Sequence, residues 1–307
     1  MSLFGKLKNI GRVTNSYNFH SPSLKRGRMQ NPQDTNWAGL DWSAWVNFES
    51  PISTYQTHIS NKAGVYRVRS LQSNELIYIG QTGRNLRERV RALVKHVLRP
   101  QGDPPWNDPH TAAPVLWAYK NENQFHYEVS VAHLEVPYTQ RQCFEDYLLH
   151  LHRNHYNRST LANFGHSHPL WSRPSNKKQN RPMMKNGSTK LQTSLPRAIN
   201  ATDFHSNTWL GLHWQKHALT QTVNLPDLPG IYRFVTAEGL AYCGESHSLR
   251  KRLSTHSKNS NFKNTNCLYS VMPDAEPHHL KEREVDMIGA YYAITSQSPT
   301  YQYTNGQ

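Results

Sequence analysis

The chain has 307 residues, of which 36% are hydrophobic, and its formal net charge is +14 with the histidines neutral. This length suits about two domains of ordinary size, and the positive charge favours a polyanionic partner such as nucleic acid. No apolar stretch approaches the roughly 18 residues of a membrane-spanning helix, and the N-terminus has no apolar signal core, so we expect a soluble, cytoplasmic protein without a membrane partner.

The positive charge is unevenly distributed. Lysine and arginine exceed aspartate and glutamate by 7 in residues 1–170, by 6 in residues 171–205 and by 1 in residues 206–307. We therefore expect the positive potential on the first half of the chain and the segment after it. The alternative is a charge that serves solubility alone. The three cysteines form neither a disulfide framework nor a zinc pattern.

A polar arm and a hairpin are expected first. Residues 1–36 are rich in asparagine, serine and basic residues without periodicity, so we expect an arm that is partly disordered. Apolar residues recur in 64–71 and in 76–82 with a polar turn between them, which predicts a β-hairpin. Asn85, with Glu88 three residues on, then has the pattern of a helix N-cap and predicts a helix to about Leu98.

The chain next predicts two strands and a helix. Residues 115–119 and 125–135 are expected as strands, joined by the polar turn at 120–123. Thr139 with Gln142 has a capping pattern that predicts the start of a helix.

The remaining chain repeats this plan in shorter form. Asparagine, serine, lysine and proline dominate residues 165–205, which predicts a linker. The later segments predict a hairpin, a helix, a strand and a final helix, at residues 230–235 with 240–245, 248–256, 267–272 and 278–294.

One set of short motifs occurs twice in the same order. The first copy has Gly64-Val65-Tyr66, Tyr78-Ile79-Gly80 and Leu86-Arg87-Glu88-Arg89-Val90, and the second has Gly230-Ile231-Tyr232, Tyr242-Cys243-Gly244 and Leu249-Arg250-Lys251-Arg252-Leu253. Upstream, Trp37-Ala38-Gly39-Leu40-Asp41-Trp42 matches Trp209-Leu210-Gly211-Leu212-His213-Trp214. The offset between copies falls from 172 at the first tryptophans to 163 at the last arginines. This slow drift indicates a duplicated domain and not a short-period solenoid.

The duplication predicts four parts. They are a polar arm (1–36), a first domain (37–170), a basic linker (171–205) and a compact second domain (206–307).

Both copies resemble the GIY-YIG nuclease superfamily, which includes excision nucleases, homing endonucleases and restriction enzymes. The resemblance covers residues 64–163 and 230–302. It implies an α/β (α+β) fold in which each domain has a small, mainly antiparallel three-stranded sheet flanked by helices. It also implies that the first tyrosine activates a water, the helix arginine stabilises charge on the phosphate, and the later glutamate binds a divalent metal. The expected cofactor is Mg²⁺, with Mn²⁺ able to substitute.

In the first copy the resemblance assigns the catalytic roles to Tyr66, Tyr78, Arg89, Glu145 and Asn163, with Glu145 as the metal ligand. One position departs from the family. Many members have histidine or tyrosine four residues after the arginine, where this chain has Leu93. His96 lies on the same helix face two turns from Arg89, about 10 Å along the axis, and is the candidate replacement.

In the second copy the roles fall on Tyr232, Tyr242, Arg252, His256, Glu284 and Gln302, with Glu284 as the metal ligand. His256 stands where the family has its histidine. Gln302 replaces the usual asparagine and is one methylene longer.

Basic residues beside these motifs are expected to bind DNA phosphates. They are Arg84, Arg87, Lys177, Lys178, Arg181, Lys185, Arg250 and Lys251.

Two other residue groups have competing interpretations. His150, His152, His155, His166 and His168 lack zinc spacing, so we expect solvated or phosphate-contacting histidines. The tryptophans of the repeated segment could stack on bases, but their apolar neighbours favour core packing.

The sequence therefore predicts a metal-dependent DNA endonuclease of the restriction or phage-defence type. Its partner is double-stranded DNA, and two active sites in one chain allow cleavage of both strands by a monomer, with oligomers not excluded. One alternative is a repair or structure-specific nuclease with one degenerate copy. The other is a catalytically silent nucleic-acid-binding protein.

Overall fold

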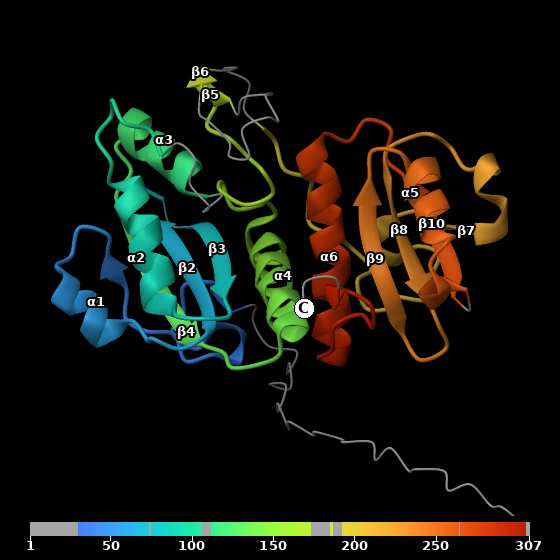
Figure 1. Cartoon of the computed structure of the whole chain (residues 1–307), viewed down its shortest axis with the longest axis horizontal. Helices are drawn as coiled ribbons and strands as arrows, with labels where there is room; N and C mark the ends of the chain where they lie inside the picture. The colour runs from blue at the N-terminus through green and yellow to red at the C-terminus, as the bar shows by residue number, and fades with distance from the viewer. Residues whose placement is uncertain are drawn as a thin grey trace, which may run out of the picture.

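The computed structural model describes residues 30–73, 75–105, 112–172, 185–186, 192–263 and 265–304. It has two four-stranded antiparallel sheets, each flanked by helices. The two sheets lie on either side of a central pair of helices, α4 (Tyr138–Tyr156) and α6 (Pro277–Thr295) (Figure 1). The predicted α/β fold class is confirmed.

The first sheet has the order β1-β4-β2-β3. Its strands are β1 (Val46–Asn47), β2 (Gly64–Ser70), β3 (Leu76–Thr82) and β4 (Tyr127–His133). Helices α1 (Ile52–His58), α2 (Leu86–Val97) and α3 (Ala113–Asn123) cover one face through an apolar cluster that includes Tyr66 and Val68. Helix α4 covers the opposite face, where Val65 packs, because successive strand residues point to opposite faces.

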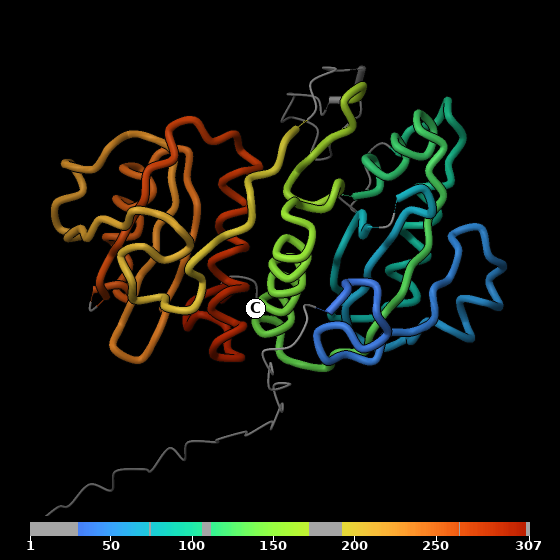
Figure 2. The backbone as a smooth tube through the Cα atoms, turned by 180° about the vertical axis from the view of Figure 1, so that it is seen from behind, coloured from blue at the N-terminus to red at the C-terminus, as the bar shows by residue number. Residues whose placement is uncertain are grey.

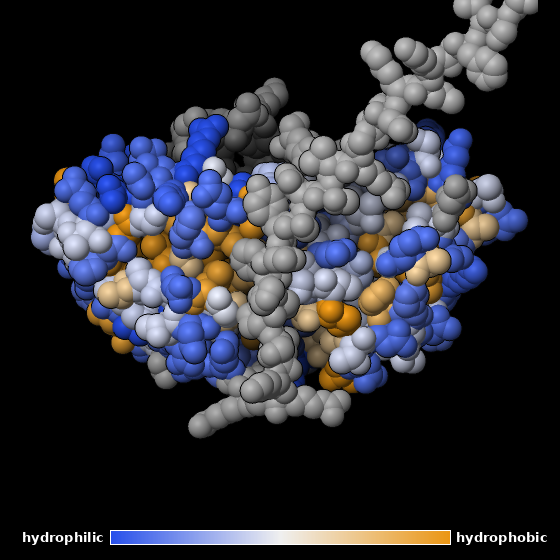
Figure 3. Space-filling view, turned by 90° about the horizontal axis from the view of Figure 1, so that it is seen from below, coloured by the Kyte–Doolittle hydropathy of each residue, from blue (hydrophilic) through white to orange (hydrophobic). Residues whose placement is uncertain are grey.

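The second sheet has the same plan, in the order β7-β10-β8-β9. Its strands are β7 (Gln215–His217), β8 (Gly230–Val235), β9 (Leu240–Ser246) and β10 (Asn266–Val271). Helix α5 (Leu249–His256) lies on one face and α6 on the other. The view from behind shows the same arrangement, with the two inner helices side by side (Figure 2). Seen from below, hydrophobic residues reach the surface mainly on the side of the first domain (Figure 3).

The family resemblance implied three strands per sheet, and each sheet has four. The additional strands are β1 and β7, which pair with β4 and β10. Both are two or three residues long and largely polar, so they carry little of the alternation that identifies a strand.

Two local predictions are wrong. The strand and turn expected at 115–123 form helix α3, which has a proline in its first turn and ends before the left-handed residue Gln124. Its residues from Ala113 to Tyr119 are all buried, and a short apolar run without polar interruption does not distinguish a strand from a helix. Thr139 is not an N-cap, because α4 starts one residue earlier, after Pro137.

The two predicted hairpins are confirmed, as is the predicted helix cap at Asn85. The Asn85 side chain accepts a hydrogen bond from the Glu88 amide, and Ser248 caps α5 by accepting from Lys251. These caps orient the helices immediately after the hairpin strands.

The predicted domain limits stay a prediction, but two segments placed outside the domains contact their cores. Pro32, in the expected arm, accepts a hydrogen bond from the buried Arg67 guanidinium. In the expected linker, Leu195 accepts from Arg153 of α4 and Thr193 accepts from His278 of α6. Residues 192–195 therefore bridge the central helices.

Each domain buries an arginine against the repeated tryptophans. The Arg67 guanidinium lies 4.2 Å from the Trp42 ring centroid, and the Arg233 guanidinium lies 4.2 Å from that of Trp214. Trp37 and Trp209 are also buried and accept, through their carbonyls, the indole N–H of Trp42 and Trp214. The tryptophans of the repeated segment therefore pack in the core, as their apolar neighbours predict.

Helices α4 and α6 run antiparallel, since Phe144 near the start of α4 packs on Tyr292 near the end of α6. Farther along, Arg153 of α4 binds Asp286 of α6 through Nε at 3.0 Å and Nη2 at 3.1 Å. His150 Nδ1 lies 3.2 Å from the same carboxylate. A buried ion pair thus lies at the centre of the interdomain contact.

The expectation of solvated histidines is wrong for four of the five. His150, His152, His166 and His168 are buried. His150 and His166 contact Asp286 and His278 of α6. His168 contacts Tyr119 and Asn123 of α3, and His152 packs on Tyr156.

Removal of the Asp286 charge provides a test of this interface. Burial raises the pKa of Asp286, but Arg153 and His150 together hold the pKa at about 2. Asp286→Asn leaves Arg153 without its main partner, so we expect a loss of roughly 3–5 kcal/mol in the free energy of unfolding. The measurement is denaturant unfolding. The exposed Asp274→Asn is the control, and equal stability of the two variants would contradict a stabilising role for the pair.

Candidate active sites

The motif glycines make room for the first tyrosine of each copy. Tyr66 on β2 pairs with Gly80 on β3, and Tyr232 on β8 pairs with Gly244 on β9. A Cβ on Gly80 would lie 2.6 Å from the Tyr66 ring, and a Cβ on Gly244 would lie 2.5 Å from the Tyr232 hydroxyl. Any side chain there would displace the tyrosine, so the neighbouring strand needs glycine.

The first glycine of each motif fixes the sheet against the following helix. A Cβ on Gly64 would lie 2.2 Å from the Ala132 carbonyl oxygen and 2.9 Å from the Leu86 side chain. Gly230 meets the corresponding carbonyl and leucine of the second domain. This close approach holds the start of α2 or α5 beside the tyrosine.

Three predicted side chains of the second copy form one hydrogen-bonded group. The Tyr232 hydroxyl lies 2.9 Å from His256 Nε2, and Arg252 Nε donates to that hydroxyl at 3.1 Å. The Tyr242 ring stacks on Tyr232 with centroids 6.1 Å apart. Arg252 and His256 are four residues apart on α5, so they share one face of the helix.

The electrostatics of this group favour a neutral imidazole. Burial and then the charge of Arg252 lower the pKa of His256 to about 4. Burial raises the pKa of Tyr232 well above its usual value. At neutral pH the tyrosine hydroxyl therefore accepts from Arg252 and donates to His256 Nε2, which is arranged to take up a proton.

The first copy brings together Tyr66, Tyr78 and Arg89 but lacks the histidine. The two tyrosine rings have centroids 5.9 Å apart. Burial raises the pKa of Tyr66 to about 12, against the lowering effects of the Arg89 charge and of hydrogen bonds with Arg89 and Tyr78. Leu93, at the position of the missing histidine, is fully buried in the core. Replacement by His96, which is half-buried, stays a prediction.

Glu145 faces the first site beside two arginines. Burial raises its pKa to about 7, while the charges of Arg89 and Arg141 lower it. Arg141 donates through Nε to Gln81 Oε1 at 2.9 Å. The sequence reasoning missed Arg141, although its position four residues before Glu145 on one helix was a usable signal.

Glu284 faces the second site in a more acidic environment. Burial raises its pKa to about 8, with further increases from the charges of Asp146 and Glu245, while Arg252 and Lys281 lower it. Glu245 corresponds to Gln81 and directly follows the motif glycine, but the resemblance did not point to it. Asp146 belongs to α4 of the other domain, so only the tertiary structure could place it here.

The two terminal amides bind strand backbone. Asn163 Oδ1 accepts from the Ile79 amide at 3.0 Å, and Asn163 Nδ2 donates to the Ile79 carbonyl at 2.9 Å. Gln302 Oε1 accepts from the Cys243 amide at 3.2 Å. Both partners directly follow the second motif tyrosine on an edge strand, so the amides position the strand instead of facing the substrate.

Two of the expected DNA contacts instead hold protein carbonyls. Arg87 donates to the Ile59 and Gln56 carbonyls at 3.0 and 2.9 Å. Arg250 donates to the Leu225 carbonyl at 2.7 Å. The remaining described ones, Arg84 and Lys251, are exposed. Lys177, Lys178, Arg181 and the side chain of Lys185 lie outside the described residues.

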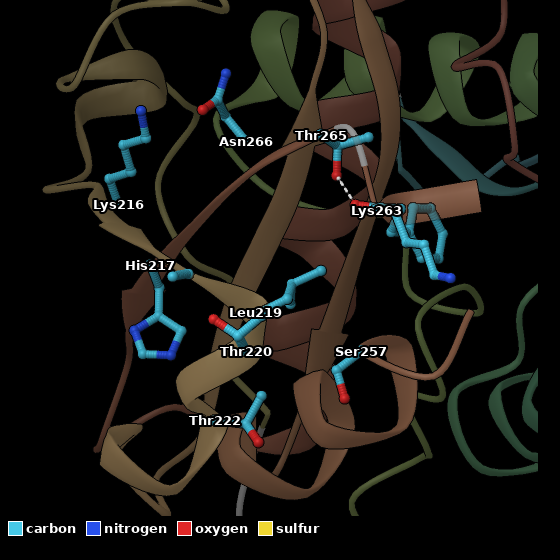
Figure 4. Close-up of a pocket in the computed structure, with 11 residues that line it drawn as sticks. Lys216, His217, Leu219, Thr220, Thr222, Ser257, Lys263, Thr265 and Asn266 are labelled. Carbon is cyan, nitrogen blue, oxygen red and sulfur yellow. Dashed lines mark hydrogen bonds between the residues drawn. The ribbon is translucent and has the colours of Figure 1, made fainter. Parts of the chain in front are cut away.

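A cavity of about 910 Å³ lies next to the second site. Its described lining contains Lys216 and Lys263, several threonines and no carboxylate (Figure 4). Phe262 forms part of its wall and packs edge-on against His256, with ring centroids 5.0 Å apart. Phe262 therefore contacts both the cavity and His256, whereas the described lining includes none of the predicted site residues.

Metal binding would depend on single glutamates. Within the described ranges, no three His, Cys, Asp or Glu side chains converge as a metal-binding group. Mg²⁺ binds proteins through one or two carboxylates with substrate phosphates and water as further ligands, and Glu145 and Glu284 fit that mode.

Helices in the described part of the chain are either too short or too polar to cross a membrane. Comparison of the chain with protein-family models, curated proteins and solved structures gives no significant match.

The pKa of His256 gives a test of the site geometry that needs no substrate. Arg252→Gln removes the positive charge beside the imidazole, so the pKa should rise from about 4 towards the usual 6.5, while burial keeps it from reaching that value. The measurement is an NMR titration of the histidine ring protons. Lys251→Gln, on the adjacent exposed residue, is the control. An unchanged pKa of His256 in Arg252→Gln would contradict the placement of the Arg252 charge beside the imidazole.

Proposed function

We propose that this protein is a metal-dependent DNA endonuclease with one active site in each domain. The observation that carries the proposal is the hydrogen-bonded group of Tyr232, His256 and Arg252, with Glu284 close enough to interact electrostatically. Most of this arrangement recurs in the first domain. The net charge of +14 supports a polyanionic substrate.

The geometry supports a proton relay in the second site. A water attacks phosphorus and gives its proton to the Tyr232 oxygen, while Tyr232 passes its own proton to His256 Nε2. This transfer avoids a free phenolate, which burial makes costly. Arg252 stabilises the charge on the phosphate as the bond to the leaving oxygen breaks. Glu284 would hold Mg²⁺, which would supply Lewis-acid stabilisation of that oxygen.

The first site has to work without this relay. Leu93 offers no acceptor, and the Tyr66 hydroxyl is bonded to Arg89 and Tyr78 instead. We expect the first site to cleave more slowly, since a positioned general base contributes roughly 10²–10⁴-fold. This difference favours, as the second candidate function, a repair or structure-specific nuclease whose first copy is degenerate.

Cleavage of both strands is supported by the relation of the two domains. Their sheets have the same order, and their glutamate helices pack antiparallel. This is the arrangement of an isologous dimer formed within one chain. Two sites related in this way suit the antiparallel strands of a duplex, as a restriction or defence enzyme requires.

Glutamate variants test the assignment of one site per strand. Glu145→Gln and Glu284→Gln should each convert supercoiled plasmid to the nicked form in Mg²⁺ without linearising it, because each variant lacks one metal ligand. The double variant should be inactive. The measurement is gel separation of the plasmid forms over time.

Two other outcomes of this experiment would change the proposed function. Full activity of Glu145→Gln with complete loss in Glu284→Gln would identify the first copy as degenerate. Binding of DNA without cleavage by the wild-type protein, in Mg²⁺ and in Mn²⁺, would leave a nucleic-acid-binding protein.

The pH dependence should distinguish the two sites. The pKa values of Glu145 and Glu284 are raised to about 7 and about 8, so each carboxyl is protonated below that pH and binds metal poorly. At limiting Mg²⁺, nicking by Glu284→Gln should fall about tenfold per pH unit below about 7. Nicking by Glu145→Gln should fall below about 8. If the two variants lost nicking activity over the same pH range, Glu145 and Glu284 would not differ in pKa as described. Saturating Mg²⁺ should shift both pH profiles to lower pH.

A further inference from the structure

The loop that carries each terminal amide continues into a residue with left-handed backbone. Phe164 follows Asn163 with φ 58°, and Tyr303 follows Gln302 with φ 61°. The two residues occupy corresponding positions in the duplicated domains. Each extends away from the strand that its neighbouring amide holds.

The second loop docks on the glutamate helix of the other domain. The Tyr303 hydroxyl of the second domain donates to the Asp146 carboxylate on α4. In the first domain, Phe164 packs against the domain's own apolar cluster, which Val285 of α6 also contacts. The next residue, Gly165, faces α6, since its Cβ position lies 3.4 Å from Lys281 Nζ.

The docked residue of α4 is adjacent to a candidate metal ligand. Asp146 directly follows Glu145. The helix that presents Glu145 to the first domain therefore also receives the terminal loop of the second domain.

We infer that the second active site is completed by the opposite domain, with Asp146 and Tyr303 acting as its positioning residues. The chain of contacts for the second site runs from Asp146 to Tyr303, to the adjacent Gln302, and through its amide to Cys243 on β9. Tyr242 precedes Cys243 on this edge strand and stacks on Tyr232.

Edge strands need such support because one side of their backbone lacks a neighbouring strand. Loss of the contact between the loop and α4 releases Gln302, and the Cys243 amide then loses its partner. The second site is loosened although none of the residues that face its substrate is changed. Separation of the domains would loosen the second site, so its activity depends on the intact central helix pair.

The structural test is hydrogen exchange at the Cys243 amide in the full chain. Asp146→Val leaves the Tyr303 hydroxyl without its acceptor and should speed exchange about tenfold, as expected for the loss of one buried hydrogen bond. The double variant Asp146→Val with Tyr303→Phe replaces the polar pair by an apolar pair and should restore slow exchange. Tyr292→Phe removes a hydroxyl from the same interface without touching this loop, and it should leave exchange unchanged.

The functional test uses the same variants with Glu145→Gln, so that only the second site can nick. Asp146→Val should lower kcat about tenfold with little change in KM, and the added Tyr303→Phe should recover most of it. Lack of recovery in both measurements, or unchanged exchange in Asp146→Val, would overturn the inference. The functional arm rests on the proposed nuclease activity, but the exchange arm does not. Faster exchange in Asp146→Val, together with no DNA cleavage by the wild-type protein, would reject the proposed nuclease function. It would still support the contact between Asp146 and the loop of Tyr303.

Discussion

The packing of α4 against α6 is the interaction on which the rest of the structure depends. Each helix covers the inner face of its own sheet, so their contact joins two cores into one body. The buried pair of Arg153 and Asp286 lies within that contact, and Glu282 adds a second carboxylate 3.4 Å from the guanidinium. Separating a buried charge from its partner costs several kcal/mol of stability, so the two helices tolerate little displacement. The same helices carry Glu145 and Glu284, so the interface that fixes the domains also fixes the two candidate sites.

Duplication within one chain has allowed the two sites to diverge. In a homodimer both sites would share one sequence, whereas here each position can change alone. His256 corresponds to Leu93, and Glu245 corresponds to Gln81. The first site has two arginines beside its glutamate, and the second has two further carboxylates. The second candidate site is therefore the more acidic of the two and the first the more basic, and one interface holds them together.

Much of the fold follows from local sequence, and the failures have identifiable causes. The hairpins carry strong alternation and close contacts at glycine, and the caps at Asn85 and Ser248 are decided within four residues. Helix α3 shows no helical period, because the burial of its residues from Ala113 to Tyr119 removes the polar positions that reveal one. The burial of His150 is not evident from its neighbours in the chain, because its partner Asp286 lies 136 positions away.

The sequence by itself determined the repeated motifs and their spacing, and the resemblance of those motifs to a nuclease superfamily suggested the chemistry that we propose. Arg252 and His256 share a helix face whatever surrounds them, because they are one turn apart. Only the tertiary structure decided that Asn163 and Gln302 bind strand backbone, that Arg87 and Arg250 hold carbonyls, and that Asp146 belongs with the second site. These contacts join residues separated by 25 to 157 positions. Whether such residues meet is set by how sheets and helices pack, and that packing leaves no periodic trace in the chain.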